Sequence, residues 1–198
     1  MSISKNYLLP RPGLPGLLDR IAGPKATTAE LLIQFIPPAI FAMVAPIYAQ
    51  NLPLDWTLGQ LGLISLLGFD LIGGILTNAT SSAKRWFHRR EQTWQNHLVF
   101  VSIHLVHIFL VALLFRNSDW SFFWIVSSYL IGSSILILRI PLYLQRSLAL
   151  GLYSLALLGN LYLFDPTPGL DWFLPLFFLK LLVSHLLNET PYQPNEIR

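Results

Sequence analysis

The 198-residue chain contains no cysteine, and only 12% of its residues carry charge. The first absence excludes disulfide bonds, iron–sulfur clusters and thiol catalysis, although it says little about the cellular compartment. The second argues against an ordinary soluble domain, which usually has about twice this share of charged residues. Hydrophobic residues make up 54% of the chain, and the mean hydropathy is +0.55. These values indicate an integral membrane protein.

Short catalytic motifs are also missing. The chain has no GxSxG nucleophile motif, so a serine hydrolase lacks its usual support. The histidines match neither HExxH nor the repeated histidine clusters of membrane desaturases. The question of enzymatic activity therefore stays open, and the position of polar residues within apolar stretches becomes the best guide to function.

Six apolar stretches are long enough to cross a bilayer, whose ~30 Å hydrocarbon core needs about 20 residues of helix. They cover 29–49, 57–77, 97–115, 120–138, 141–163 and 169–187. We therefore expect an all-α integral membrane protein built as a six-helix transmembrane bundle. The chain divides into a cytoplasmic or interfacial segment at 1–28, the bundle at 29–187 and a cytoplasmic tail at 188–198.

Lysine and arginine set the expected orientation, because positively charged loops stay on the cytoplasmic side. Four of these residues precede the first span, and four more lie between positions 84 and 90. The alternate loops hold only Arg116, against Asp55, Asp119, Asp165 and Asp171. Both termini are therefore expected inside, in a multi-pass protein of the plasma (inner) membrane. The pI of 9.3 follows from this topology, and nucleic-acid binding is not expected.

The segment before the first span has a pattern of its own. Apolar residues recur at helical spacing between Leu14 and Ile21, which predicts a short helix lying on the inner leaflet. Thr27 and Glu30 match a capping box at the start of the first span. Three prolines inside that span remove backbone donors and should kink or break the helix.

The third span carries three histidines, His97, His104 and His107, on one arc of roughly 80°. The second span carries Asp70, whose carboxylate needs a partner if it is ionised so deep in a membrane. Asp70 and His104 each lie about 10 Å inside the inner boundary at 1.5 Å per residue, and Lys180 falls near the same level. We expect Asp70 and His104 to face each other as the catalytic or proton-carrying pair, with Lys180 in the same layer.

The expected ligand site surrounds this layer at the cytoplasmic mouth. Its ligand-binding residues would be Asn78, Lys84, Arg85, His88, Arg89, Arg146 and Lys180. Basic side chains around a protonatable layer suit an anionic or lipid-like small molecule, and they suit its proton-coupled transport. Membrane lipid is the other expected partner, because a basic loop attracts the anionic headgroups of the inner leaflet.

A membrane-embedded enzyme is the main alternative. His104, His107 and Asp70 could together ligate zinc or iron for chemistry on a lipid-like substrate. A haem held by His97 and His185 has less support, because only their shared position near the inner edge favours it. The sequence therefore leaves the cofactor unknown.

A structural role is the remaining alternative. Asp70 could pair with Lys180 or with a histidine simply to hold helices together. The fifth span has small residues that would suit lateral oligomers: Ser147, Ala149, Gly151, Ser154, Ala156 and Gly159. The chain would then be a subunit of a membrane complex.

Overall fold

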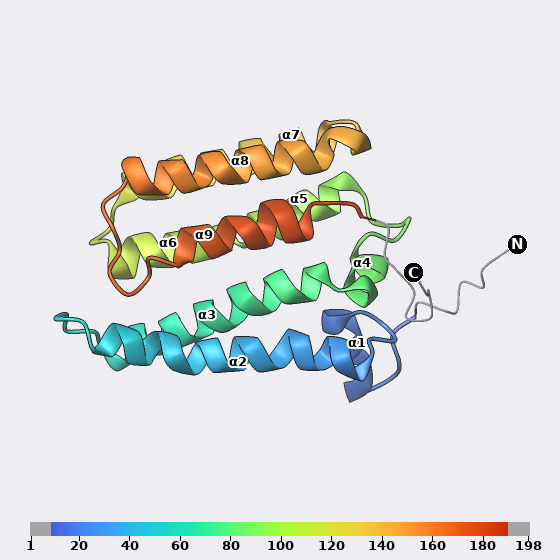
Figure 1. Ribbon diagram of the computed structural model, residues 1–198, viewed down its shortest axis with the longest axis horizontal. Coiled ribbons are helices and arrows are strands. Elements are labelled where there is room, and N and C mark those ends of the chain that lie inside the picture. Colours follow the sequence, from blue (N-terminus) through green and yellow to red (C-terminus); the bar gives the residue numbers. More distant parts are fainter. Residues whose placement is uncertain (1–8, 190–198) are drawn as a thin grey trace, which may run out of the picture.

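The computed structural model describes residues 9–189, which Figure 1 shows as a bundle of helices. No strand occurs between residues 9 and 189. The elements are α1 (Leu14–Ala22), α2 (Thr28–Gln50), α3 (Leu58–Ala79), α4 (Ser81–Phe87), α5 (Trp94–Ile103), α6 (Leu105–Phe115), α7 (Trp120–Arg139), α8 (Leu142–Tyr162), α9 (Phe173–Phe178) and the π-helix η2 (Leu179–His185). Of the predicted tail at 188–198, only Asn188 and Glu189 fall within the described residues.

Four stretches are long and apolar enough to cross a membrane, namely α2, α3, α5 together with α6, and α7. Helices also occupy the other two predicted spans. α8 has 21 residues, but Gln145, Arg146 and Asn160 make it less apolar. α9 and η2 have six and seven residues, so together they are shorter than the ~20 residues that a ~30 Å core needs. The all-helical fold with four candidate membrane spans is therefore established.

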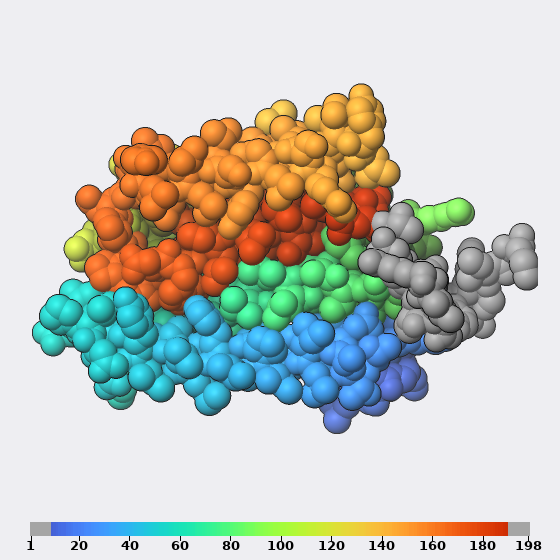
Figure 2. Space-filling model, in the orientation of Figure 1, coloured from blue at the N-terminus to red at the C-terminus, as the bar shows by residue number. Residues whose placement is uncertain are grey.

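The segment formed by α9 and η2 is the centre of the bundle. It packs against α3, α7 and α8, and in Figure 2 its red surface lies between α8 and α3. Most of its side chains are buried. By contrast, α2 packs mainly against α3 and exposes an apolar face. A short central helix thus connects the α2–α3 layer to the α7–α8 layer.

Figure 1 distinguishes two ends of the bundle, which we call the α4 end and the loop end. α1, α4 and the turn between α7 and α8 lie at the α4 end. The connections 51–57, 116–119 and 163–172 lie at the loop end. The two ends differ in charge, because the basic residues between 84 and 90 all belong to the α4 end.

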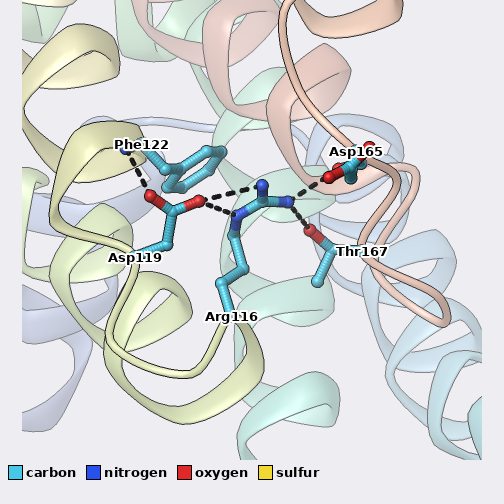
Figure 3. A network of polar contacts seen from close by, with 5 residues as sticks. All are labelled: Arg116, Asp119, Phe122, Asp165 and Thr167. Carbon is cyan, nitrogen blue, oxygen red and sulfur yellow. Dashed lines mark hydrogen bonds and ion pairs between the residues drawn. The ribbon is translucent and has the colours of Figure 1, made fainter.

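Arg116 ties two connections together at the loop end (Figure 3). Its guanidinium donates to Asp119 Oδ2 at 3.1 and 3.2 Å, to the Asp165 carbonyl at 2.8 Å and to Thr167 Oγ1 at 2.7 Å. Asp119 also accepts from the Phe122 backbone N–H at 2.9 Å and so caps α7. That bond, together with Arg116, lowers the pKa of Asp119. The one basic residue of the predicted outer loops therefore joins the α6–α7 turn to the α8–α9 connection.

The predicted capping box at the start of the first span is confirmed. Glu30 Oε2 accepts from the Thr27 backbone N–H at 2.8 Å, and Thr27 Oγ1 accepts from the Glu30 N–H at 3.2 Å. The predicted break at the prolines is wrong, because α2 is continuous from Thr28 to Gln50. Pro38 packs closely on α3 instead, where a Cβ added at Gly73 would lie 3.5 Å from its ring.

The small residues of α8 do not form one surface. Ala149 and Ala156 are buried in the bundle, whereas Gly151 and Ser154 are exposed. Residues 149 and 156 are two turns apart and share a helix face, while residue 151 lies about 200° away from 149. The exposed face that remains for lateral packing is therefore narrower than the sequence indicated.

α1 is fastened to α4 and α2 through its C-terminal end. The Ala22 carbonyl accepts from Ser82 Oγ at 2.9 Å and from Gln34 Nε2 at 3.3 Å. Gly23 follows with φ at +88°, and a Cβ added there would lie 2.4 Å from the Ser82 carbonyl carbon. The opposite side of α1 exposes apolar residues, with Leu14 81% exposed. α1 therefore has the amphipathic form predicted for it.

We predict that Gly23→Ala loosens α1. A side chain in the left-handed region costs roughly 1–2 kcal/mol, and this one would also collide with the Ser82 backbone. Limited proteolysis should cut faster between α1 and α2, and thermal unfolding in detergent should begin at a lower temperature. Gly62→Ala is the matched control, because its Cβ would meet nothing within 4 Å. Equal behaviour of the two variants would contradict the predicted role of Gly23.

Candidate functional site

All five histidines of the chain lie in two neighbouring clusters along the bundle. The central cluster consists of Asp70, His104, His107 and Lys180. The second, which we call the end cluster, lies towards the α4 end and consists of Asn78, Lys84, His88, His97 and His185. Phe100 separates them, because its ring centroid is 4.6 Å from that of His104 and 4.0 Å from that of His185.

The central cluster is built on one carboxylate oxygen. Asp70 Oδ2 accepts from Lys180 Nζ at 2.6 Å and lies 3.0 Å from His107 Nε2. The Lys180 side chain is 2% exposed, whereas that of Asp70 is 43% exposed. The ammonium is thus sealed inside the bundle, while the carboxylate that neutralises it remains accessible from one side.

Gly74 makes room for this buried lysine. It lies one turn after Asp70 on α3, and a Cβ added there would lie 2.2 Å from Lys180 Cε and 3.0 Å from its Nζ. The lysine comes from η2, a π-helix. Single-turn π-helices are often found at functional sites. Gly74 and the π-helix therefore serve the same contact between α3 and η2, whereas Gly73 faces α2.

A break in the third long helix positions the two histidines. α5 ends at Ile103 and α6 begins at Leu105, and His104 forms the turn between them. His104 Nδ1 lies 2.7 Å from the Phe100 carbonyl, and His107 Nδ1 lies 3.2 Å from the His104 carbonyl. Side chains that bond to backbone carbonyls interrupt the regular hydrogen bonds of a helix. The imidazoles themselves thus account for the break.

His107 lies between two acceptors. Its Nδ1 faces the His104 carbonyl, and its Nε2 faces the Asp70 carboxylate. A neutral imidazole can donate from only one nitrogen, whereas the protonated ring donates from both. The geometry can therefore hold an additional proton between His107 and Asp70.

Asp70 and His104 were predicted to face each other; they belong to one cluster, but no direct hydrogen bond or ion pair joins them. Asp70 contacts His107 and Lys180 instead, while His104 stacks on His107 with ring centroids 5.1 Å apart. Matched depth was the basis for choosing His104, but the break at this residue turns its ring towards the Phe100 carbonyl. The predicted membership of Lys180 in this layer is confirmed.

The predicted zinc or iron site is not formed. Among residues 9–189, no three histidine, aspartate or glutamate side chains gather to hold a metal. Asp70 Oδ2 is the oxygen that faces His107 and would have to ligate a metal beside it. It already accepts a hydrogen bond from the Lys180 ammonium. The less supported option, a haem between His97 and His185, meets a different obstacle: His97 Nδ1 lies 3.2 Å from His185 Nε2, which leaves no space for a haem between the two rings.

The end cluster is a closed hydrogen-bond network. Asn78 Nδ2 donates to the Gly74 carbonyl at 2.8 Å, so its Oδ1 accepts from His185 Nδ1 at 3.1 Å. His185 Nε2 then accepts from His97 Nδ1 at 3.2 Å. His88 Nε2 donates to the His185 carbonyl at 2.9 Å. The bonds define one neutral tautomer for each of these three rings.

Lys84 lies beside this network and bonds to the backbone at the end of η2. Its Nζ donates to the carbonyls of Ser184 at 2.7 Å and Leu187 at 2.6 Å, at the C-terminal end of η2. Burial lowers the pKa of Lys84 to about 8. Burial, together with the charge of Lys84, also lowers the pKa of His88 to about 3. His88 is therefore neutral at physiological pH and offers no positive charge to a ligand.

The remaining predicted ligand residues have different surroundings. The Asn78 amide donates to the Gly74 carbonyl within the bundle. Lys180 belongs to the central cluster, where it bonds to Asp70. Arg89 turns back onto its own segment, donating to the Trp86 carbonyl at 2.6 Å with its guanidinium 3.8 Å from the centre of the Trp86 ring. Arg85 lies on α4 outside the cavity described next.

Lys84 and Arg146 line one cavity of 610 Å³ at the α4 end. Its other walls come from α3, α4, the start of α8 and the segment after η2: Ala79, Ser81, Leu142, Tyr143, Gln145, Ser147, Leu187, Asn188 and Glu189. Arg146 is paired with Glu189. The sequence pattern pointed to the two cations but gave no reason to expect Glu189 beside them.

A second cavity, of 430 Å³, lies at the loop end between α7, α8 and α9. Aromatic and leucine side chains form most of its wall, with Asn160, Thr167 and Asp171 as polar members. None of the predicted site residues reaches it. The candidate site is therefore the pair of clusters and the cavity at the α4 end.

The chain matches no known protein family, no curated protein and no solved structure. Its function must therefore be argued from the site alone.

We predict that the Asp70–Lys180 pair behaves as a coupled unit. Asp70→Leu leaves a buried ammonium without its carboxylate, which should cost about 3–5 kcal/mol. Lys180→Met leaves Asp70 half-exposed and still in contact with His107, so it should cost less. The double variant should be more stable than Asp70→Leu alone. Thermal unfolding in detergent measures this cycle, and additive losses in the double variant would contradict it.

Proposed function

We propose that the chain is a six-span protein of the plasma (inner) membrane that binds an anionic, lipid-like molecule and links this binding to a proton. The ligand enters a polar pocket facing the cytoplasm, and the proton is held by Asp70 and His107. The four candidate spans support membrane insertion. α8 and the α9–η2 segment run alongside these helices in the same bundle (Figure 1), which supports counting them as the remaining two spans.

The charge difference between the two ends supports the orientation. Lys84, Arg85, Arg89 and Arg90 lie at the α4 end, together with Arg146, and positive residues favour the cytoplasm. The loop end has acidic residues, and its Arg116 is neutralised by Asp119. We therefore place the α4 end and both termini in the cytoplasm.

The half-exposed carboxylate of Asp70 is the observation that carries this proposal. Asp70 lies about 18 Å along α3 from Leu58 and about 14 Å from Ala79, so it is near mid-span. An ionisable group at this depth is costly, and such groups usually serve a substrate or proton pathway. A purely structural ion pair would be expected to seal both partners, yet Asp70 is 43% exposed and Lys180 is 2% exposed.

The charge balance of the central cluster explains why a proton and an anion would bind together. Lys180 and Asp70 neutralise each other, so a proton on His107 adds one positive charge to an apolar surrounding. An anion bound in the cavity at the α4 end, outside the central cluster, offsets part of this charge. By linkage, anion binding then favours proton uptake, and protonation favours anion binding by the same factor.

A membrane-embedded enzyme is the second candidate. Asp70 and His107 lie 3.0 Å apart, and the His104 carbonyl orients the imidazole. This pair has the arrangement of a general acid and base that needs no metal. A lipid-like ester that reached the exposed side of Asp70 would be the substrate class in that case.

We predict that proton uptake accompanies ligand binding and depends on His107. Titration calorimetry of a monoacyl phosphate probe, repeated in buffers with different ionisation enthalpies, gives the number of protons taken up per bound probe. The wild-type protein should take up protons at neutral pH, whereas His107→Gln and Asp70→Asn should bind the probe without doing so. Asp119→Asn, at the loop end, is the control and should keep the uptake.

Two results would decide between the candidates. The same proton uptake in His107→Gln and the wild type would remove the proposed link. Chromatography of the probe after incubation tests the enzyme, because a product that forms with the wild type and not with Asp70→Asn would favour acid–base chemistry over transport.

We predict that the two ends label from opposite sides of the membrane. The chain has no native cysteine, so single cysteines at Glu91 and Ser118, both exposed, give clean reporters. In right-side-out vesicles an impermeant maleimide should label Ser118→Cys, while Glu91→Cys should react only after the membrane is opened. Labelling of both from the same side would end the six-span proposal.

A further inference from the structure

The cavity at the α4 end has the size and composition of a ligand site. Its volume of 610 Å³ lies within the ~300–1,000 Å³ range of small-molecule pockets. Lys84 and Arg146 supply positive charge, while Ser81 and Ser147 supply hydroxyl groups. Leu142 and Leu187 supply apolar wall. The cavity therefore offers polar contacts and apolar contacts to one bound molecule.

Lys84 is prepared to donate to an anion. Its side chain is nearly buried, at 5% exposure, and Nζ donates to the Ser184 and Leu187 carbonyls. These bonds use two of the three ammonium hydrogens, and they hold the group in place at the cavity wall. Because Lys84 also lines the cavity, its positive charge faces any ligand bound there.

The start of α8 adds a second source of positive potential. α8 has 21 residues, and no side chain caps its N-terminus, which follows Pro141. Leu142 and Tyr143, the first residues of the helix, line the cavity. Unsatisfied N–H groups at the start of a helix carry a partial positive charge and bind anions. Lys84, Arg146 and the start of α8 therefore act on the same space.

The carboxylate of Glu189 is itself an anion at the wall of this cavity. Its carboxylate pairs with Arg146, and both residues line the cavity. A carboxylate on the arginine indicates that the cavity suits an oxyanion. It also means that an external oxyanion must displace Glu189 from Arg146 before it can use both cations.

We propose that this cavity binds a phosphate group, held by Lys84, Arg146 and the start of α8, and that Glu189 competes with it from within the chain. The proposal deepens the proposed function, because it names the chemistry of the anionic ligand. It concerns binding alone, so it stands apart from the proton link at His107. The phosphate could belong to a lipid headgroup or to a soluble molecule, which the experiment separates.

Two probes test this site with the full chain in detergent or nanodiscs. One is inorganic phosphate, and the other is phosphatidic acid in phosphatidylcholine vesicles or nanodiscs. Arg146→Gln should weaken binding by about tenfold, the scale of one lost charge-assisted bond. Glu189→Gln should strengthen it several-fold, because the internal competitor is lost. Binding of phosphatidic acid alone identifies a headgroup site, and binding of both probes identifies a phosphate site open to soluble ligands.

Arg139→Gln is the matched control. Arg139 is also an exposed arginine at the α4 end, but it lies over Trp94 and outside the cavity. Unchanged binding in both Arg146→Gln and Glu189→Gln would overturn the proposal, and so would an equal loss in Arg139→Gln. Phosphate binding that depends on Arg146 and Glu189 in a protein that takes up no proton would support this site and contradict the proton link alone.

The charge of Lys84 gives the site a pH dependence. The titratable and charged groups around it are Glu189, Arg146, His88, His97 and His185. The pKa of Lys84, lowered by burial to about 8, means that the ammonium is lost as the pH rises through 8. Phosphate binding should therefore weaken above pH 8 in the wild type, and Lys84→Met should bind weakly at every pH. Constant affinity from pH 7 to pH 9 would contradict the role of Lys84.

Discussion

The buried ammonium of Lys180 is the constraint on which the site depends. A lysine that is 2% exposed in the centre of a membrane bundle needs a carboxylate, and Asp70 supplies it at 2.6 Å. The contact requires α3 and η2 to approach closely, which Gly74 allows because it has no Cβ. It also fixes the carboxylate beside His107. One ion pair thus sets the approach of two helices and the position of the carboxylate that His107 contacts.

The two clusters have different physical characters. In the end cluster, hydrogen bonds join Asn78, His185 and His97 in a row, and His88 bonds to the His185 carbonyl. In the central cluster Asp70 is partly exposed, and His107 lies between the Asp70 carboxylate and the His104 carbonyl. The end cluster therefore joins α3, α5 and η2 through its side chains, while the central cluster leaves one carboxylate accessible.

Much of the fold could be predicted from the sequence because it depends on local patterns. Apolar length located helices in all six stretches, and Thr27 with Glu30 marked the start of the first. Depth along the helices also brought Asp70 and Lys180 to one layer. Each of these features depends on residues near one another in the sequence, or on a count of residues from a helix end.

The rest of the site depends on long-range contacts that spacing does not reveal. His107 rather than His104 meets Asp70, because the helix breaks where imidazoles bond to carbonyls. Arg89 was expected at the ligand site, but it lies over Trp86 in its own segment. Glu189 meets Arg146 only because the chain after η2 returns past the start of α8. Side-chain direction, rather than depth, was the missing information.

The π-helical winding of η2 allows one residue from each cluster to bond to α3. Lys180 and His185 are five residues apart, and both bond to α3, at Asp70 and at Asn78. In a regular α-helix, residues five apart point about 140° away from each other, so one of them would leave α3. A π-helix brings residues i and i+5 into line. Deleting a single residue between them would let the segment rewind as an α-helix, so its length is under a constraint that its apolar composition alone would not impose.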